Sequence, residues 1–296
     1  MLDAMKNLAL VVTSSESHNL VEKLFSSLEE QNACIRIHVY FVNQHVERYN
    51  LDGKFKNIVI DVIEINHVIP LSVARNLALD CIGFGEYDLI AFPDDDCWYP
   101  SNLIAELERF FDDNEDVDVV CTNVYDPSNG LSYGGRPFDI IEKINMRNIF
   151  DLPISVGIFI RLKNIKLDAI RYDENIGAGR KIGSGEETKL IYELLKHKGN
   201  IVYNGYLRVC HPVLNKEYKL SDIHKYYKYA VGFGYIAGIM IRERSYVTIW
   251  VFLYYVGRTF LGLCRYVTNS INRKIYINRL KGMLAGIVKG LGCNDQ

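Results

Sequence analysis

The sequence predicts an α/β fold, in which helices flank a mainly parallel sheet and a helical segment follows at the C-terminal end. Short apolar runs alternate with amphipathic helical patterns over about the first 125 residues. Long helical patterns, rich in aromatic and basic residues, then begin near residue 219. A length of 296 residues suits one large domain with an appendage. We therefore expect a domain over residues 1–218 and a helical segment over residues 219–296.

The expected strands and helices alternate along the chain. Runs of β-branched and aromatic residues predict strands at residues 8–13, 35–42, 57–65, 88–92, 117–124 and 154–162. Apolar residues that recur every three or four positions predict helices at residues 19–30, 71–82, 101–111 and 186–196. Residues 126–185 are rich in turns, and residues 200–212 read as two short strands ending at His211. Strands separated by helices in this way form a largely parallel sheet.

Charge is distributed unevenly between the two parts. Residues 219–296 carry 12 Lys and Arg against three acids, whereas residues 1–218 carry 22 basic and 33 acidic side chains. The basic end is expected to have an anionic partner. Because aromatic and aliphatic residues lie among its cations, interfacial helices on an anionic membrane surface are favoured. Helices packed on the core or on a second subunit are the alternative, and the segment is too apolar for nucleic acid.

Cysteine usage and hydropathy bear on location. The seven cysteines are scattered without a CxxC pair, which indicates reduced, mostly buried thiols in a cytosolic protein. The N-terminal residues read as a first strand and not as a signal peptide. The longest uncharged runs, at 229–241 and 245–257, have 13 residues each. A spanning helix needs roughly 18–20 residues, so we expect none here.

The stretch "AFPDDDCWYP" (91–100) places Asp94, Asp95 and Asp96 directly after an expected buried strand. Adjacent carboxylates repel one another, and a bound divalent cation such as Mg²⁺ or Mn²⁺ relieves the repulsion. Acids that stabilise a helix N-terminus are the alternative, although one carboxylate would serve that purpose. Thr13 and Asn43 end neighbouring strands. Since ligands bind at the carboxyl ends of parallel strands, we expect these side chains to lie together.

Glu186 and Glu187 begin an expected helix in "GSGEETKL" (183–190), after a loop with four glycines. Either acid can stabilise the helix N-terminus or act as a general base next to a metal site. His211, in "VCHP", is either a metal ligand or a structural histidine. Arg75, in "LSVARN", lies on an apolar helix face and needs an anionic partner, unless it is an ordinary surface arginine.

In combination, these landmarks resemble the family 2 glycosyltransferases, inverting sugar transferases with the Rossmann-like GT-A fold. The resemblance covers about residues 7–215, with the matching stretches in the same order: "VVT", "LSVARNLAL", "AFPDDDCWYP", "GSGEETKL" and the final "HP". It implies a nucleotide-sugar donor, with a UDP-sugar expected, Mn²⁺ or Mg²⁺ as cofactor, and inversion at the transferred sugar. Bacterial enzymes of this kind build capsule or O-antigen repeats on saccharide or lipid-linked acceptors. A cytoplasmic enzyme, peripheral at the inner face of the membrane, is therefore expected.

The resemblance also implies roles for individual residues. Asp95, with Asp96 and His211, would bind the metal, and Glu187 would be the base, with Glu186 as the alternative. Donor contacts would come from Thr13, Ser14, Asn43, Arg75 and Asp94. The chain departs from the family pattern in three places: a Glu-Glu pair in place of Glu-Asp, Asn43 where an Asp is common, and "TSSESHN" without an Asn-Arg.

Two other functions compete with sugar transfer to a glycan. A sugar nucleotidyltransferase would carry a glycine-rich, arginine-containing loop after the first strand, and "VVTSSESHN" has none. A catalytically silent, membrane-associated partner protein would have no need of the acids at 94–96 and 186–187. Transfer to a protein acceptor stays open.

Overall fold

The computed structural model describes residues 6–16, 18–50, 53–83, 85–213 and 218–292. The strands are β1 Asn7–Ser14, β2 Arg36–Asn43, β3 Ile58–Glu64, β4 Leu89–Ala91, β5 Val119–Asp126, β6 Leu131–Ser132, β7 Ile141–Lys143, β8 Ile158–Arg161 and β9 Ile201–Cys210. The helices are α1 His18–Glu29, α2 Leu71–Leu79, α3 Leu103–Asp113, α4 Glu186–Lys196, α5 Asp222–Arg242, α6 Tyr246–Arg265 and α7 Ser270–Leu291. Short 3₁₀ turns occur at η1 Tyr133–Gly135, η2 Ser155–Gly157 and η3 Leu167–Ala169.

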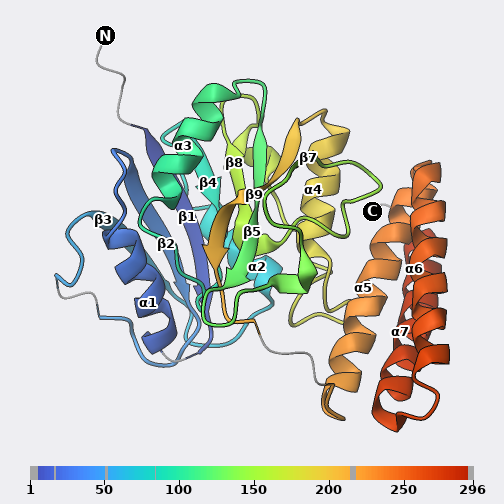
Figure 1. Cartoon of the computed structure of the whole chain (residues 1–296). Helices are drawn as coiled ribbons and strands as arrows, with labels where there is room; N and C mark the ends of the chain where they lie inside the picture. Colours follow the sequence, from blue (N-terminus) through green and yellow to red (C-terminus); the bar gives the residue numbers. More distant parts are fainter. Residues whose placement is uncertain (1–5, 17, 51–52, 84, 214–217, 293–296) are drawn as a thin grey trace.

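The described strands form one nine-stranded sheet in the order β3-β2-β1-β4-β8-β5-β9-β7, and β6 pairs with β5 (Figure 1). The long pairings, β1 with β2, β2 with β3 and β5 with β9, are parallel. The antiparallel pairings are short and involve β6, β7 and β8. This mixed, mostly parallel sheet confirms the predicted fold class.

Two hydrophobic layers lie on opposite faces of the sheet. Side chains of α1 and α3 pack on one face, and those of α2, α4 and α5 pack on the other. Alternation along β1 serves both layers, since Leu8 and Leu10 belong to the first and Ala9 and Val11 to the second. The carboxyl ends of the parallel strands are left uncovered by these layers, which is where polar side chains gather.

The last part of the sheet differs from the prediction. Residues 201–210 form one strand instead of two, because β9 follows β5 along its whole length. The register shifts midway, so that Thr122 lies opposite Asn204 while Asn123 lies opposite Arg208. An irregularity of this kind takes up extra residues without ending the strand. It also brings the chain to His211 at the same edge as the end of β4.

The three C-terminal helices lie side by side at one side of the molecule (Figure 1). α5 packs into the core of the sheet through Tyr235 and Ile236. It also contacts α7 backbone to backbone: a Cβ at Gly286 would lie 2.2 Å from the Val231 carbonyl oxygen, and one at Gly290 would lie 2.1 Å from that of Tyr235. α5 is thus a core helix, as the packing alternative expected, and it carries α7 on its outer side.

Within the described residues, α6 is the one helix with the length and composition to cross a membrane. Length and composition alone thus give one candidate, whereas the expectation from the sequence is that no segment spans a membrane. That expectation rested on uncharged runs, and Arg258 interrupts the run inside the helix.

The cysteines of the described chain are free thiols. Three are buried, Cys97, Cys121 and Cys210, and three are exposed, Cys34, Cys81 and Cys264. Cys293 lies outside the described residues. The expectation of mostly buried thiols is met at only half of these six positions.

Candidate active site

The three adjacent aspartates turn to three different partners at the end of β4. Asp94 forms a bridge with Thr13, which brings it beside the end of β1. Its Oδ1 accepts a hydrogen bond from Arg75 Nη2 at 3.0 Å. The carboxylate of Asp95 accepts a hydrogen bond from the Ser14 hydroxyl. Asp96 Oδ1 lies 3.1 Å from His211 Nε2. Separate partners reduce the repulsion that the sequence alone implied.

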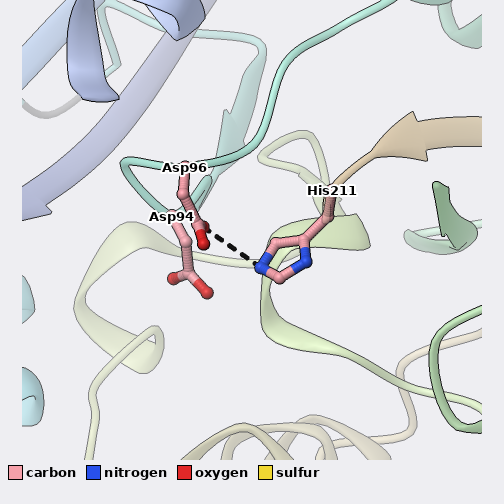
Figure 2. A group of neighbouring side chains, drawn as sticks. All are labelled: Asp94, Asp96 and His211. Carbon is pink, nitrogen blue, oxygen red and sulfur yellow. Dashed lines mark ion pairs between the residues drawn. The ribbon is translucent and has the colours of Figure 1, made fainter. Parts of the chain in front are cut away.

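Asp94, Asp96 and His211 form a group that can hold a metal ion, with ligand atoms within 4.8 Å of one another. Figure 2 shows both carboxylates on the same side of the imidazole ring. His211 Nδ1 lies 2.7 Å from the Pro212 carbonyl oxygen, a contact that leaves Nε2 as the coordinating atom once its proton is lost. The structure therefore places Asp94 in this group, where the resemblance implied Asp95.

The pKa values around this group indicate a place that favours positive charge. Burial raises the pKa of Asp94, although Arg75 opposes the effect. Burial also raises the pKa of Asp95 to about 6, against the hydrogen bond from Ser14. For His211, burial acts to lower the pKa, but the bond to Asp96 and its charge outweigh burial, so the pKa is raised. A cation here would relieve the cost of these partly buried carboxylates.

Arg75 is a buried component of the site and not a surface arginine. Its side chain is 1% exposed, and the guanidinium carbon lies 5.0 Å from the centre of the Tyr172 ring. Nη2 bonds Asp94, whereas Nη1 has no hydrogen-bond partner among the described residues. α2 therefore delivers a fixed positive charge beneath the acidic cluster, which is the anionic partner that the sequence required.

Two cavities meet at Asp94 and His211. The first, of about 380 Å³, lies at the ends of β1, β2 and β4 and is lined by Thr13, Gln44 and residues 94–96. The second, of about 370 Å³, is lined by Arg75, Glu186 and Glu187, among others. Asp94 and His211 border both cavities. A ligand with two parts can therefore occupy both and pass the acidic cluster between them.

Glu186 and Glu187 begin α4, as predicted, after Gly185 in a left-handed conformation (φ 97°). Burial raises the pKa of Glu187 to about 7, and the charge of Glu186 adds to this effect. A carboxylate with a pKa near neutrality is well matched to accept a proton from a hydroxyl. Glu186 is 8% exposed, and its Oε2 has no hydrogen-bond partner within the described chain.

The glycine-rich loop before α4 is held against α2. Ser72 Oγ donates to the Ile176 carbonyl at 2.7 Å, and the Leu71 amide donates to Ala178 at 3.1 Å. Gly177 has φ 103°, and a Cβ there would lie 3.1 Å from the Glu186 carboxylate. Only glycine fits this position without strain. These bonds tie down a loop that its composition indicated to be flexible.

Two predicted donor contacts are engaged elsewhere. Asn43 is fully buried, and its amide donates to the Glu47 carbonyl at 2.8 Å and to Glu64 Oε2 at 2.7 Å. It lines neither cavity, and the next residue, Gln44, lines the first instead. Ser14 is buried and reaches the site through Asp95. Thr13 lines the first cavity, as expected.

Two residues of the second cavity had escaped the sequence-based reasoning. Arg136 donates three hydrogen bonds, to the carbonyls of Leu152, Tyr133 and Pro153. Burial lowers its pKa, against the opposing charge of Glu187. A lone arginine in a Gly-Gly-Arg-Pro turn gave no signal of this position. Tyr229 comes from α5, and the apolar spacing of Tyr229, Phe233 and Ile236 was a signal that one helix face points inward.

Comparison with known proteins rests on structure alone, because no family model and no curated protein matches this chain. TarS 1-349 from S. aureus superposes with a TM-score of 0.57 and 16% identity, over 77% of this chain and 64% of that one, less than two thirds of its length. The complex of TarS 1-349 with UDP-GlcNAc gives 0.54 and 13%, over 95% and 91%.

The mannosyltransferase PcManGT from Pyrobaculum calidifontis, in complex with GDP-Man and Mn²⁺, superposes with a TM-score of 0.57 and 10% identity, over 98% of this chain and 88% of that one. The chain has a GT-A-like fold. This likeness confirms the fold that the resemblance implied, including the helical segment after the sheet.

Proposed function

We propose that this chain is an inverting glycosyltransferase, which moves a sugar from a nucleotide-sugar to a hydroxyl group of an acceptor. One observation carries the proposal: Glu187, with a pKa of about 7, lines the same cavity as Asp94, which also belongs to the Asp-Asp-His group at the strand ends. Similar folds that hold UDP-GlcNAc and GDP-Man support the choice of donor class.

The donor nucleotide occupies the first cavity in this proposal. Thr13 and Gln44 line it, with residues 94–96 at the side toward the second cavity. Asn43 fixes the turn after β2 and presents Gln44. Arg75 sets the position of Asp94 through its hydrogen bond. A UDP-sugar is the expected donor, and a GDP-sugar is the alternative that titration tests.

Asp94, Asp96 and His211 would hold Mn²⁺ or Mg²⁺. Two carboxylates and one imidazole suit Mn²⁺ well, whereas Mg²⁺ prefers oxygen ligands, and the similar mannosyltransferase holds Mn²⁺. When bound, the cation supplies neutralisation of charge on the leaving nucleoside diphosphate. Asp95 supports the group from the side, through Ser14.

Glu187 takes the proton of the acceptor hydroxyl in the second cavity. The acceptor oxygen forms a bond to the anomeric carbon as the bond from that carbon to the diphosphate oxygen breaks, and the leaving group keeps the electron pair. Attack from the face opposite the diphosphate inverts the configuration, so an α-linked donor gives a β-glycoside. Glu186 is the alternative base, since its Oε2 has no partner among the described residues.

The acceptor is a saccharide or a lipid-linked saccharide, and the process is assembly of a surface polysaccharide such as capsule or O-antigen. The second cavity supports this choice, because Tyr229 and Phe233 offer aromatic faces beside the acids and Arg136. The enzyme acts in the cytoplasm, peripheral to the membrane. Protein acceptors are the alternative and would appear as labelled protein in transfer assays.

Calorimetric titration tests the donor and the metal together. The chain is titrated with UDP, GDP and several UDP-sugars, first with Mn²⁺ and then with EDTA. We expect one nucleotide to bind with Mn²⁺ and to lose its binding with EDTA. Asp96→Asn should lose this dependence, and Tyr206→Phe, at an exposed site outside both cavities, is the matched control. Absence of binding to every nucleotide would favour the silent partner protein.

A further inference from the structure

The outer helix α6 exposes more of its large apolar side chains than it buries. Its outward face is apolar and includes Trp250, 75% exposed, and Leu253, 51% exposed. Its inward face buries Phe252 together with two threonines, Thr248 at 0% and Thr259 at 3% exposure. A surface helix of a water-soluble protein turns its apolar stripe to the core instead. α6 is therefore adapted to an apolar medium on its outer side.

The exposed apolar side chains extend along most of the helix, with Gly257 and the exposed Arg258 between Tyr254 and Phe260. The residues that form this apolar face are Tyr246, Val247, Ile249, Trp250, Leu253, Tyr254, Phe260 and Leu261. Six of them lie between residues 246 and 254, and the other two follow at 260 and 261, in a helix of 20 residues, which corresponds to about 30 Å. Single exposed apolar residues are normal, but a group of eight on one helix marks an interaction surface.

Positive charge surrounds this face. Residues 244–294 contain eight Lys and Arg and no acid. Arg258 and Arg265 are exposed on α6, and Arg273 and Lys274 are exposed where α7 begins. Two copies of the chain that met through this face would bring their cations together without acids to balance them. An anionic lipid surface balances the charge and takes up the aromatic side chains.

The arrangement of the bundle requires α6 to lie along a membrane and not through it. α7 follows α6 in the chain but packs along α5, where Gly282 lies against Tyr227 and Gly290 against Tyr235. α5 in turn packs on the sheet domain. If α6 crossed a bilayer, α5 and α7 at its side would enter the bilayer with it. The charged side chains of Arg273 and Lys274 would then be buried in lipid, together with the part of the sheet domain on which α5 packs.

We propose that α6 is an interfacial helix, which docks this protein on anionic lipid with Trp250 and Leu253 in the headgroup region. The inference deepens the proposed function, because it names the surface on which a lipid-linked acceptor would be met. The test of membrane docking does not depend on sugar transfer. Docking can therefore be disproved while the proposed activity is confirmed, and the activity can be disproved while docking is confirmed.

Flotation of the full chain with vesicles tests the proposal. We expect binding to vesicles of phosphatidylcholine and phosphatidylglycerol in equal amounts, and at least about tenfold weaker binding to phosphatidylcholine alone. The double variant Trp250→Glu, Leu253→Glu should lose binding to both kinds of vesicle. Since both side chains are largely exposed, the variant should fold, as circular dichroism and an unchanged nucleotide titration would show.

Tyr206→Glu provides the matched control, because it adds an acid at an exposed aromatic residue of β9. It should bind vesicles as the unchanged protein does. In Trp98→Phe, Trp250 is the one remaining tryptophan, and its emission should shift to shorter wavelength with the mixed vesicles. The proposal is overturned if the double variant floats like the unchanged protein. It is also overturned if the double mutation leaves the protein monomeric while the unchanged protein forms dimers and binds neither vesicle.

Discussion

The sheet domain and the C-terminal helices differ in which side chains they bury and which they expose. At the ends of β1 and β4, carboxylates and Arg75 are drawn inward, and each is held by a partner from elsewhere in the chain. On α6, eight large apolar side chains face outward, while Phe252, Thr248 and Thr259 are buried. Both arrangements cost free energy in an isolated chain in water. The difference indicates that the first is built for chemistry within the molecule and the second for contact outside it.

α5 belongs to both regions. Tyr229 and Phe233 line the cavity of Glu187, while Gly234 and Gly238 lie against α7. The helix therefore forms one wall of the candidate active site and one face of the helical bundle. α6 also contacts the sheet domain directly, because the Tyr255 hydroxyl donates a hydrogen bond to Asp151. Changes in the bundle can therefore reach the cavity through α5 and through this contact.

The largest effect is expected in the sheet domain, at Glu187. Glu187→Gln keeps the shape of the side chain but cannot accept a proton, so transfer should fall by about 10²–10⁴-fold. Donor binding, measured by calorimetry, should be unchanged. Glu186→Gln is the matched control one residue away. If that variant loses transfer while Glu187→Gln keeps it, the assignment of the base moves to Glu186.

A pH dependence follows from the raised pKa of Glu187. The base must be ionised, so kcat should rise with pH, by about tenfold per pH unit, and level off above about 7. The stability of the folded protein depends on pH in the opposite direction. The folded-state pKa lies above its ordinary value of 4.5, so stability linked to Glu187 is full below that value and is lost as pH rises through about 7.

Urea unfolding checks the second part of this prediction. Glu187→Gln should match the unchanged protein in acid and become the more stable of the two above the folded-state pKa of about 7. A difference that does not vary with pH would contradict the assignment of a raised pKa to this carboxyl group.

A smaller effect is expected from the buried cation. Arg75→Ala leaves Asp94 without its partner and should lower the free energy of unfolding by about 2–3 kcal/mol. This is less than for a fully buried pair, because 40% of the Asp94 side chain is exposed. The measurement is urea unfolding of the single variants and of Arg75→Ala with Asp94→Asn. Strictly additive losses would show that the two side chains do not interact.

The smallest effects compare two glycines of the helical bundle. Gly286→Ala places a Cβ 2.2 Å from the Val231 carbonyl oxygen, so α5 and α7 must separate, at a cost of about 1–3 kcal/mol. Gly257→Ala, on α6, meets nothing within 4 Å and should stabilise the protein by about 0.5–1 kcal/mol. Thermal unfolding measures both. Equal and small changes would mean that the bundle tolerates looser packing than its geometry indicates.

Local patterns predicted most of the fold. The strands and helices expected before residue 200 appear within a few residues of their expected bounds, and α4 has the expected bounds. The short strands β6 and β7 were not expected, because they lie in the turn-rich stretch. The spacing of apolar residues depends only on neighbours in the sequence, so it predicts strands and helices without knowledge of the tertiary structure. The prediction failed for β9, where a continuous partner strand overrides a stretch that reads as two strands.

The candidate site could be predicted by residue type but not by pairing. The strand-end acids, Arg75, His211 and Glu187 were all singled out, since charged groups after apolar runs are visible in the sequence. The roles of Asn43 and Arg136 depend on which backbone groups come within hydrogen-bond distance, and local patterns do not specify this.

The sequence by itself determined the fold class, the acidic cluster after β4, the pair of acids at the start of α4 and the basic, aromatic C-terminal segment. Only the tertiary structure decided that Asp94 joins Asp96 and His211, that Asn43 lies apart from both cavities, and that α6 exposes its apolar side. The reason is physical: composition and periodicity follow from the chain's local order, whereas distances between charges and the exposure of a helix face depend on how distant segments pack.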